Sequence, residues 1–155
     1  MKAKLILVAV TVLASQAASA DWTAKVAYDP VKDESHCVVE SPAQTIDDGY
    51  QDTRVFLRLD STTLIVMTRS NVDTDDSDVG VRVDKHELIK PDSVYLEQNV
   101  VFKKDISKII EQFKEGRRAT FTLKFWPTYP DTGAKTATFS LIGFTKAYAH
   151  LPDCG

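Results

Sequence analysis

Two aromatic residues that stand beside prolines are the strongest candidates for a binding site. Trp126 precedes Pro127 and Tyr129 precedes Pro130, and a residue before proline is sterically restricted to extended conformations, so both rings are attached to a restricted backbone. Such rings can anchor a partner, because loops on a stable scaffold often carry function and Trp and Tyr contribute strongly to interfaces. Alternatively, Trp126 covers the end of the core and Tyr129 has no special role, since aromatic residues at strand ends often pack under the sheet. We take Trp126 and Tyr129 as the candidate binding residues.

The acidic segment 71–78 has carboxylates at a spacing similar to that of calcium-binding loops. Counted from Asp73, however, Asp78 stands where such loops have a glycine, and Asp84 stands where they have a bidentate glutamate. The alternative interpretation is a solvated hairpin tip. We predict no metal site, and we keep this segment as a second candidate contact surface.

Catalytic residues have weak support in the sequence. The three histidines share no spacing that would bring metal ligands together. Asp84 and His86 could share one face of a strand as half of a catalytic dyad, but a surface ion pair or a turn is a more common use of such residues. The chain has neither a G-x-S-x-G motif nor a glycine-rich phosphate loop. We therefore predict no catalytic residues and no cofactor.

Residues 1–20 have the pattern of a signal peptide. Lys2 and Lys4 precede a short apolar run, and an Ala-x-Ala cleavage motif ends at Ala20. The apolar run is shorter than the roughly 20 residues of a membrane-spanning helix. We expect residues 21–155 to form one globular domain without a membrane segment, located in the periplasm, with secretion or attachment to the cell surface as the alternatives.

Cys37 and Cys154 are the only cysteines of the chain. In an oxidising compartment two cysteines allow one intramolecular bridge, which would join the C-terminus to the N-terminal part of the domain. A reactive thiol would require a C-x-x-C pair or a basic neighbourhood, and His36 is the only residue that suggests one. We predict a structural disulfide.

The charge balance argues against a nucleic-acid partner. The chain has 19 Lys and Arg against 22 Asp and Glu, and a net charge of −3. Loss of the signal peptide, with its two lysines, makes the charge more negative. A negatively charged domain repels phosphate backbones.

The elements that would position these residues follow from apolar periodicity. Alternation predicts strands at 22–28, 36–40, 54–59, 63–68, 79–84, 94–102, 119–125 and 137–142, the third and fourth of them as a hairpin. Residues 43–52 have loop composition. One helix is expected to begin at Asp105 as the N-cap and to end at Gly116 as a left-handed C-cap, and a second covers 144–151. The predicted fold class is α+β and β-rich: an antiparallel sheet or sandwich with two short helices packed on it and one disulfide.

The closing stretch, Leu141-Ile-Gly-Phe-Thr-Lys-Ala-Tyr-Ala-His-Leu151, resembles the strand–Gly-Phe-Thr–x-Ala–helix–Leu ending of the invasion-associated locus B family of exported bacterial proteins. Trp22, Cys37, the strand at 79–84 and the helix–Gly–strand run at 106–125 follow in a similar order. That family usually has further cysteines ahead of the central helix, and residues 93–104 have none. The resemblance implies a β-rich periplasmic or surface-associated accessory protein, linked to host association in some members and without an established catalytic role.

Together these features predict a non-enzymatic exported protein that binds an envelope or host protein. Its contact surfaces would be the loop of Trp126 and Tyr129 and the acidic segment 71–78. Two alternatives stay open: a periplasmic inhibitor of a hydrolase, and a small envelope hydrolase that uses Asp84 and His86.

Overall fold

A computed structural model of the protein describes residues 21–29, 33–73 and 78–154. The predicted signal peptide and the centre of the acidic segment, 74–77, lie outside the described residues. In chain order the elements are β1 (Thr23–Asp29), β2 (Glu34–Glu40), β3 (Gln44–Asp47), β4 (Asp52–Leu59), β5 (Leu64–Met67), β6 (Val72–Asp73), β7 (Gly80–Val83), β8 (Ser93–Tyr95), β9 (Asn99–Phe102), α1 (Ile106–Glu115), β10 (Arg118–Phe125), β11 (Lys135–Ser140), α2 (Phe144–Ala149) and the 3₁₀ turn η1 (Leu151–Asp153).

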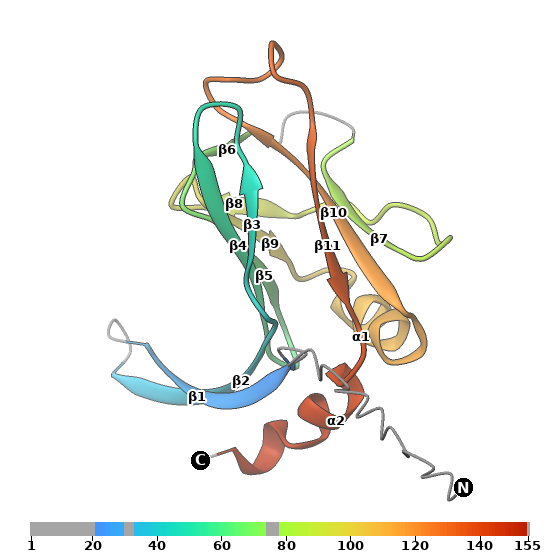
Figure 1. Ribbon diagram of the computed structural model, residues 1–155. Coiled ribbons are helices and arrows are strands. Elements are labelled where there is room, and N and C mark those ends of the chain that lie inside the picture. Colours follow the sequence, from blue (N-terminus) through green and yellow to red (C-terminus); the bar gives the residue numbers. More distant parts are fainter. Residues whose placement is uncertain (1–20, 30–32, 74–77, 155) are drawn as a thin grey trace, which may run out of the picture.

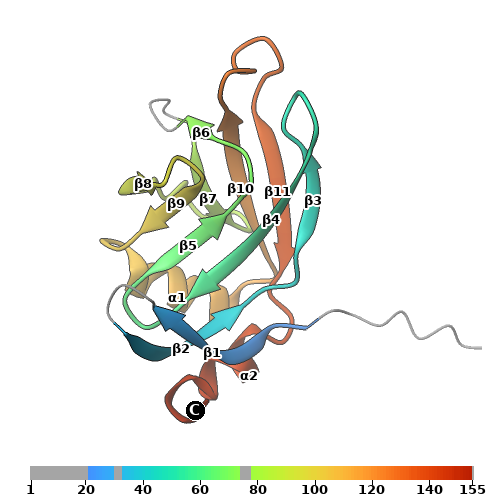
Figure 2. The ribbon, with the colours of Figure 1, turned by 90° about the vertical axis from the view of Figure 1, so that its left-hand side faces the viewer.

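The strands form two antiparallel sheets that face each other (Figures 1 and 2). The first has the order β1-β2-β4-β5-β9-β8, with β3 paired to the opposite end of β4 from β2. The second has the order β11-β10-β6, with β7 also paired to β10. The predicted β-rich α+β class, with two short helices and one disulfide, is confirmed.

The core lies between the inner faces of the two sheets. Phe121 on β10 contacts Phe102 on β9 and Phe139 on β11 edge to face, with ring centroids 6.1 and 5.8 Å apart. Along β10 and β11 these side chains alternate with polar residues, which is why the period-2 pattern located both strands. The predicted hairpin of β4 and β5 is also confirmed.

Helix α1 buries the apolar face made by Ile106, Ile109, Ile110 and Phe113, but its two ends differ from the prediction. The Asp105 side chain makes no capping hydrogen bond, and Gly116 has extended angles, φ −82° and ψ 172°, instead of left-handed ones. A Cβ at Gly116 would lie 2.5 Å from Cγ1 of Val83 and 2.7 Å from the carbonyl oxygen of Gln112. Glycine is needed here because β7 passes close to the end of the helix.

Two further expectations were wrong. The supposed loop 43–52 contains strand β3, and the supposed single strand 94–102 is the hairpin of β8 and β9. At its turn Leu96 and Glu97 have positive φ, and the Glu97 carbonyl oxygen accepts a hydrogen bond from Val72 N–H at 2.7 Å. A contact from a distant segment therefore supports this turn, which has no Gly, Pro, Asn or Asp as a local signal.

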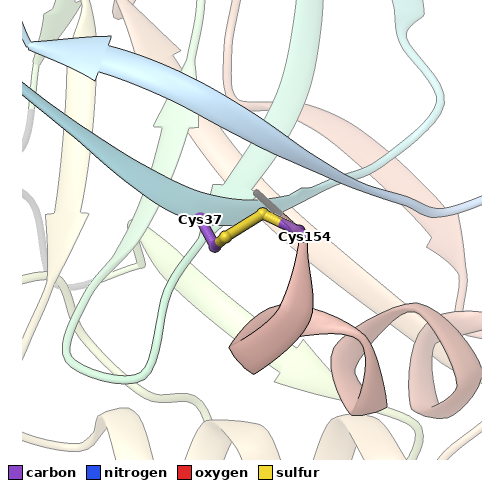
Figure 3. The surroundings of a disulfide bond; sticks show 2 residues. All are labelled: Cys37 and Cys154. Atoms are coloured by element: carbon purple, nitrogen blue, oxygen red, sulfur yellow. A yellow bond between two sulfur atoms is a disulfide. The ribbon is translucent and has the colours of Figure 1, made fainter.

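The two termini of the domain meet at one end of the molecule. The Trp22 ring packs edge-on against Phe113 and Phe144, at centroid distances of 6.1 and 5.0 Å, and its Nε1–H donates to Ser140 O at 2.8 Å. At the same end of the molecule the predicted disulfide joins Cys37 on β2 to Cys154 after η1 (Figure 3). Its Cα–Cα distance is 5.8 Å and it spans 117 residues of sequence.

Candidate functional site

Three segments meet at the end of the molecule opposite the disulfide. The β3–β4 turn and the β10–β11 loop lie together there, away from the β1–β2 ribbon and α2 (Figures 1 and 2). With the β5–β6 connection they enclose a pocket of about 390 Å³. It is lined by Asp48, Tyr50, Gln51, Arg69, Ser70, Asn71, Trp126, Pro127 and Thr128.

Trp126 contributes an exposed ring to this pocket. Its side chain is 63% exposed, and Tyr50 on the facing turn is 87% exposed. The Trp126 backbone, in contrast, is fixed, because its N–H donates to Asn71 O at 2.9 Å where β10 pairs with β6. Trp126 therefore does not cover the core, and the pocket presents two aromatic rings to solvent.

The buried residue Asp48 joins the three segments. Its Oδ1 accepts hydrogen bonds from Tyr50 N–H and Gln51 N–H, both at 2.8 Å, and its Oδ2 accepts one from the Ser70 hydroxyl. Its carbonyl oxygen accepts a hydrogen bond from Thr128 Oγ1 at 2.7 Å. The Asp48 side chain therefore holds the turn of Tyr50 against the β5–β6 connection, and its backbone carbonyl oxygen holds the loop of Trp126.

Hydrogen bonding also controls the ionisation of Asp48. Burial by itself raises the pKa of the carboxyl, but the hydrogen bonds from Ser70, Gln51 and Tyr50 outweigh it and hold the pKa below its usual range. Asp48 is thus an ionised acceptor whose role in the pocket is structural.

Tyr129 lies apart from Trp126 and does not line the pocket. Its ring covers Lys124, whose Nζ is 4.5 Å from the ring centroid and donates to the Tyr129 hydroxyl at 3.2 Å. Lys124 stands at a polar position in the alternation of β10, but only 2% of it is exposed, because Tyr129 and Asp78, at 3.9 Å from its Nζ, lie over it. The two candidate binding residues thus do not form one surface.

The acidic segment is partly a strand. Asp73 pairs with Lys124 and Val72 with Phe125 in the ladder between β6 and β10. Residues 74–77, the centre of the possible calcium loop, lie outside the described residues. Among the residues that the structure describes, no group of three or more His, Cys, Asp or Glu could hold a metal ion.

Asp84 and His86 do not share a strand face, because β7 ends at Val83 and the chain turns. Asp84 has φ 46°, and its two carboxylate oxygens accept the N–H groups of Arg117 and Arg118 at 2.9 and 3.1 Å. The bond from Arg117 is the main cause that lowers the pKa of Asp84, and the bond from Arg118 adds to it. Asp84 therefore fixes the junction between α1 and β10, and His86 is exposed on the turn.

A second cavity, of about 540 Å³, lies at the disulfide end. It is lined by Asp29, Glu34, His36, Cys37, Asp60, Ser61, Thr62, Tyr148, Leu151 and Pro152. Residues 30–32 lie outside the described residues. The cavity therefore lies beside the Cys37–Cys154 disulfide, and three of its lining residues, Asp29, Glu34 and Asp60, have carboxylate side chains.

The sequence did not reveal Asp48, Tyr50 or Arg69 as parts of a site. The polar composition of 43–52 and its Asp48-Gly49 pair indicate a loop. The available signal was Tyr50 itself, a large aromatic residue in a turn that is otherwise polar. Only the packing of three distant segments brings it next to Trp126.

Comparison with protein-family models, with curated proteins and with solved structures finds no match to this chain. The resemblance to the invasion-associated locus B family therefore stays a prediction from the sequence. In the described part of the chain, no helix has the length and apolar character needed to cross a membrane.

Proposed function

We propose that this chain is an exported, non-enzymatic binding protein of the bacterial envelope, which contacts an envelope component or a host protein through the surface around Trp126. The observation that carries the proposal is the exposed ring of Trp126 beside that of Tyr50, on loops that Asp48 holds together. Tryptophan and tyrosine are enriched among the residues that dominate binding energy. A rigid surface also loses little conformational entropy when it binds.

The location in the envelope is supported by two features of the chain. The signal-peptide pattern at 1–20 is typical of exported proteins, and the Cys37–Cys154 bond is of the kind that persists in oxidising compartments. The resemblance to the locus B family favours an accessory role in the periplasm or at the cell surface, with host association as one use of it.

Binding is favoured over catalysis by the state of the carboxylates near the candidate sites. A general acid or base works best with a pKa near the operating pH and with a free path to the substrate. Asp48 and Asp84 have lowered pKa values, and their oxygens accept hydrogen bonds from backbone N–H groups and, at Oδ2 of Asp48, from the Ser70 hydroxyl. Both side chains therefore fit a structural role better than proton transfer.

The proposal is tested by capture from an envelope extract. The bait is the mature protein, compared with the Trp126→Ala, Tyr50→Ala double variant. The matched control is Tyr95→Ala, which removes a tyrosine that is 60% exposed but lies outside the pocket.

We expect wild type and the Tyr95 variant to capture the same component and the double variant to lose it. Thermal unfolding of all three proteins verifies that they are folded. Equal capture by the folded double variant, or no specific capture by wild type, would contradict the proposal.

A further inference from the structure

We propose that the pocket beside Trp126 binds a glycan made of β-linked pyranose rings. This inference rests on the proposed binding function and names its ligand class. It is argued from the chemistry of the rings, the polar groups, the size and the rigidity of the pocket.

The two exposed aromatic rings match the faces of a sugar. A pyranose ring with equatorial substituents has two flat faces of C–H groups and an edge of hydroxyls. C–H groups are attracted to the negative face of an aromatic ring, and tryptophan offers the largest such face. Trp126 and Tyr50 line one pocket from two different loops, so they can contact one ring, or adjacent rings, of an extended chain.

The polar lining matches the hydroxyl edge of a sugar. A hydroxyl group both donates and accepts, and Gln51 and Asn71 have side-chain amides that do the same, while Arg69 donates only. Asn71 is oriented by the bond from its Nδ2 to Glu97 Oε2 at 3.2 Å. Within the described residues the side chains of Gln51 and Arg69 make no hydrogen bond or ion pair to protein, so they can bind a ligand.

The size and rigidity of the pocket also fit a glycan ligand. A volume of about 390 Å³ is at the lower end of the range of small-molecule sites, about 300–1,000 Å³. Its loops are held by hydrogen bonds that do not depend on a ligand, from Tyr50 N–H and Thr128 Oγ1 to Asp48 and from Trp126 N–H to Asn71. A sugar that binds weakly per contact gains from such preorganisation.

Other ligand classes fit the pocket less well. The net charge of −3 disfavours a nucleic acid. A lipid chain would leave the polar ends of Gln51, Arg69 and Asn71 without partners, at a cost of about 1–3 kcal/mol for each group that loses water. A glycan satisfies both the rings and the polar groups.

The test is a titration with two soluble β-1,4-linked trisaccharides, one of N-acetylglucosamine and one of glucose. The chain has two tryptophans, and Trp22 is buried in the core, so a ligand-induced change in tryptophan emission reports on Trp126. We expect a saturable blue shift for at least one trisaccharide, with a dissociation constant of about 1 mM or below. Tyr50→Ala is expected to weaken binding about tenfold, the equivalent of one lost ring contact, and Tyr95→Ala to leave it unchanged.

Calorimetry extends the test to Trp126→Ala, which has lost the fluorescent reporter. We expect no measurable heat of binding from this folded variant. The inference is overturned if wild type shows no saturable signal up to roughly 10 mM of either sugar, or if Trp126→Ala binds as tightly as wild type. Capture of an envelope protein through Trp126 without any sugar binding would reject the glycan and leave the proposed binding function standing, so the two failures are distinguishable.

Discussion

At the end of the molecule that carries Trp126, three segments are joined by hydrogen bonds to Asp48, whereas at the opposite end the C-terminal segment is joined to β2 by the bond between Cys37 and Cys154. The two tryptophans show the same contrast. Trp22, at the disulfide end, is buried among Phe113 and Phe144, and Trp126 is exposed.

The two ends are therefore stabilised by different interactions, one sensitive to reductant and the other to pH. A disulfide acts mainly by restricting the unfolded chain and responds to reductant. Hydrogen bonds to a carboxylate act in the folded state and respond to protonation. Changes at the two ends should therefore be separable by experiment.

The largest effect is expected from Cys154→Ser. Loss of a bond that spans 117 residues should destabilise the domain by about 4–5 kcal/mol in the chain-entropy model. Urea unfolding measures the difference, and wild type in reductant should unfold at the same midpoint as the variant. A variant as stable as the oxidised wild type would show that the bond has no structural role.

An intermediate effect is expected from Asp48→Ala. The hydroxyl of Ser70 and the N–H groups of Tyr50 and Gln51 would lose their acceptor, at a cost of about 1–3 kcal/mol in the free energy of unfolding. Asp131→Ala, at an exposed aspartate of the β10–β11 loop, is the matched control and should have a smaller effect.

The pH dependence of stability gives a second test of Asp48→Ala against wild type. Because the pKa of Asp48 is lower in the folded than in the unfolded state, its contribution is fully present above the unfolded pKa of about 3.9 and is lost as the pH falls through the folded pKa. Wild type should therefore lose stability below about pH 4, and Asp48→Ala should lose less. Asp47, Asp84 and Asp92 also have lowered pKa values and contribute to the acid sensitivity that remains. Identical pH profiles of wild type and variant would contradict this role of Asp48.

The smallest effect on stability is expected from Trp126→Ala. An exposed side chain outside the core should change the free energy of unfolding by no more than about 0.5 kcal/mol. The contrasting variant is Trp22→Ala, which removes a buried ring and should cost about 3–5 kcal/mol. If the two substitutions were equally destabilising, Trp126 would belong to the core and the proposed binding surface would be wrong.

Local patterns predicted the elements whose burial follows one period. The apolar face of α1 and the alternation along β10 are the best cases. The disulfide was predictable because Cys37 and Cys154 had no other partners in the chain. The hairpin of β8 and β9 was missed, since contacts from the β5–β6 connection support its turn in the absence of turn-forming residues.

The sequence predicted the loop that carries Trp126, but not the other residues of the candidate site. The prolines beside Trp126 and Tyr129 indicated a loop of interest, but they did not indicate that the first ring is exposed and that the second covers Lys124. The partners of Trp126 in the pocket, Tyr50 and Arg69, are distant in sequence and carry no common motif.

The sequence by itself determined the β-rich class, the helix α1, the disulfide and the presence of an aromatic loop, because each depends on residue type and short-range periodicity. Only the tertiary structure decided that Asp48 joins three segments, that Lys124 is buried, and that Trp126 and Tyr50 share a pocket. The physical reason is that burial and hydrogen-bond partners depend on which distant segments pack together, and no local pattern records that packing.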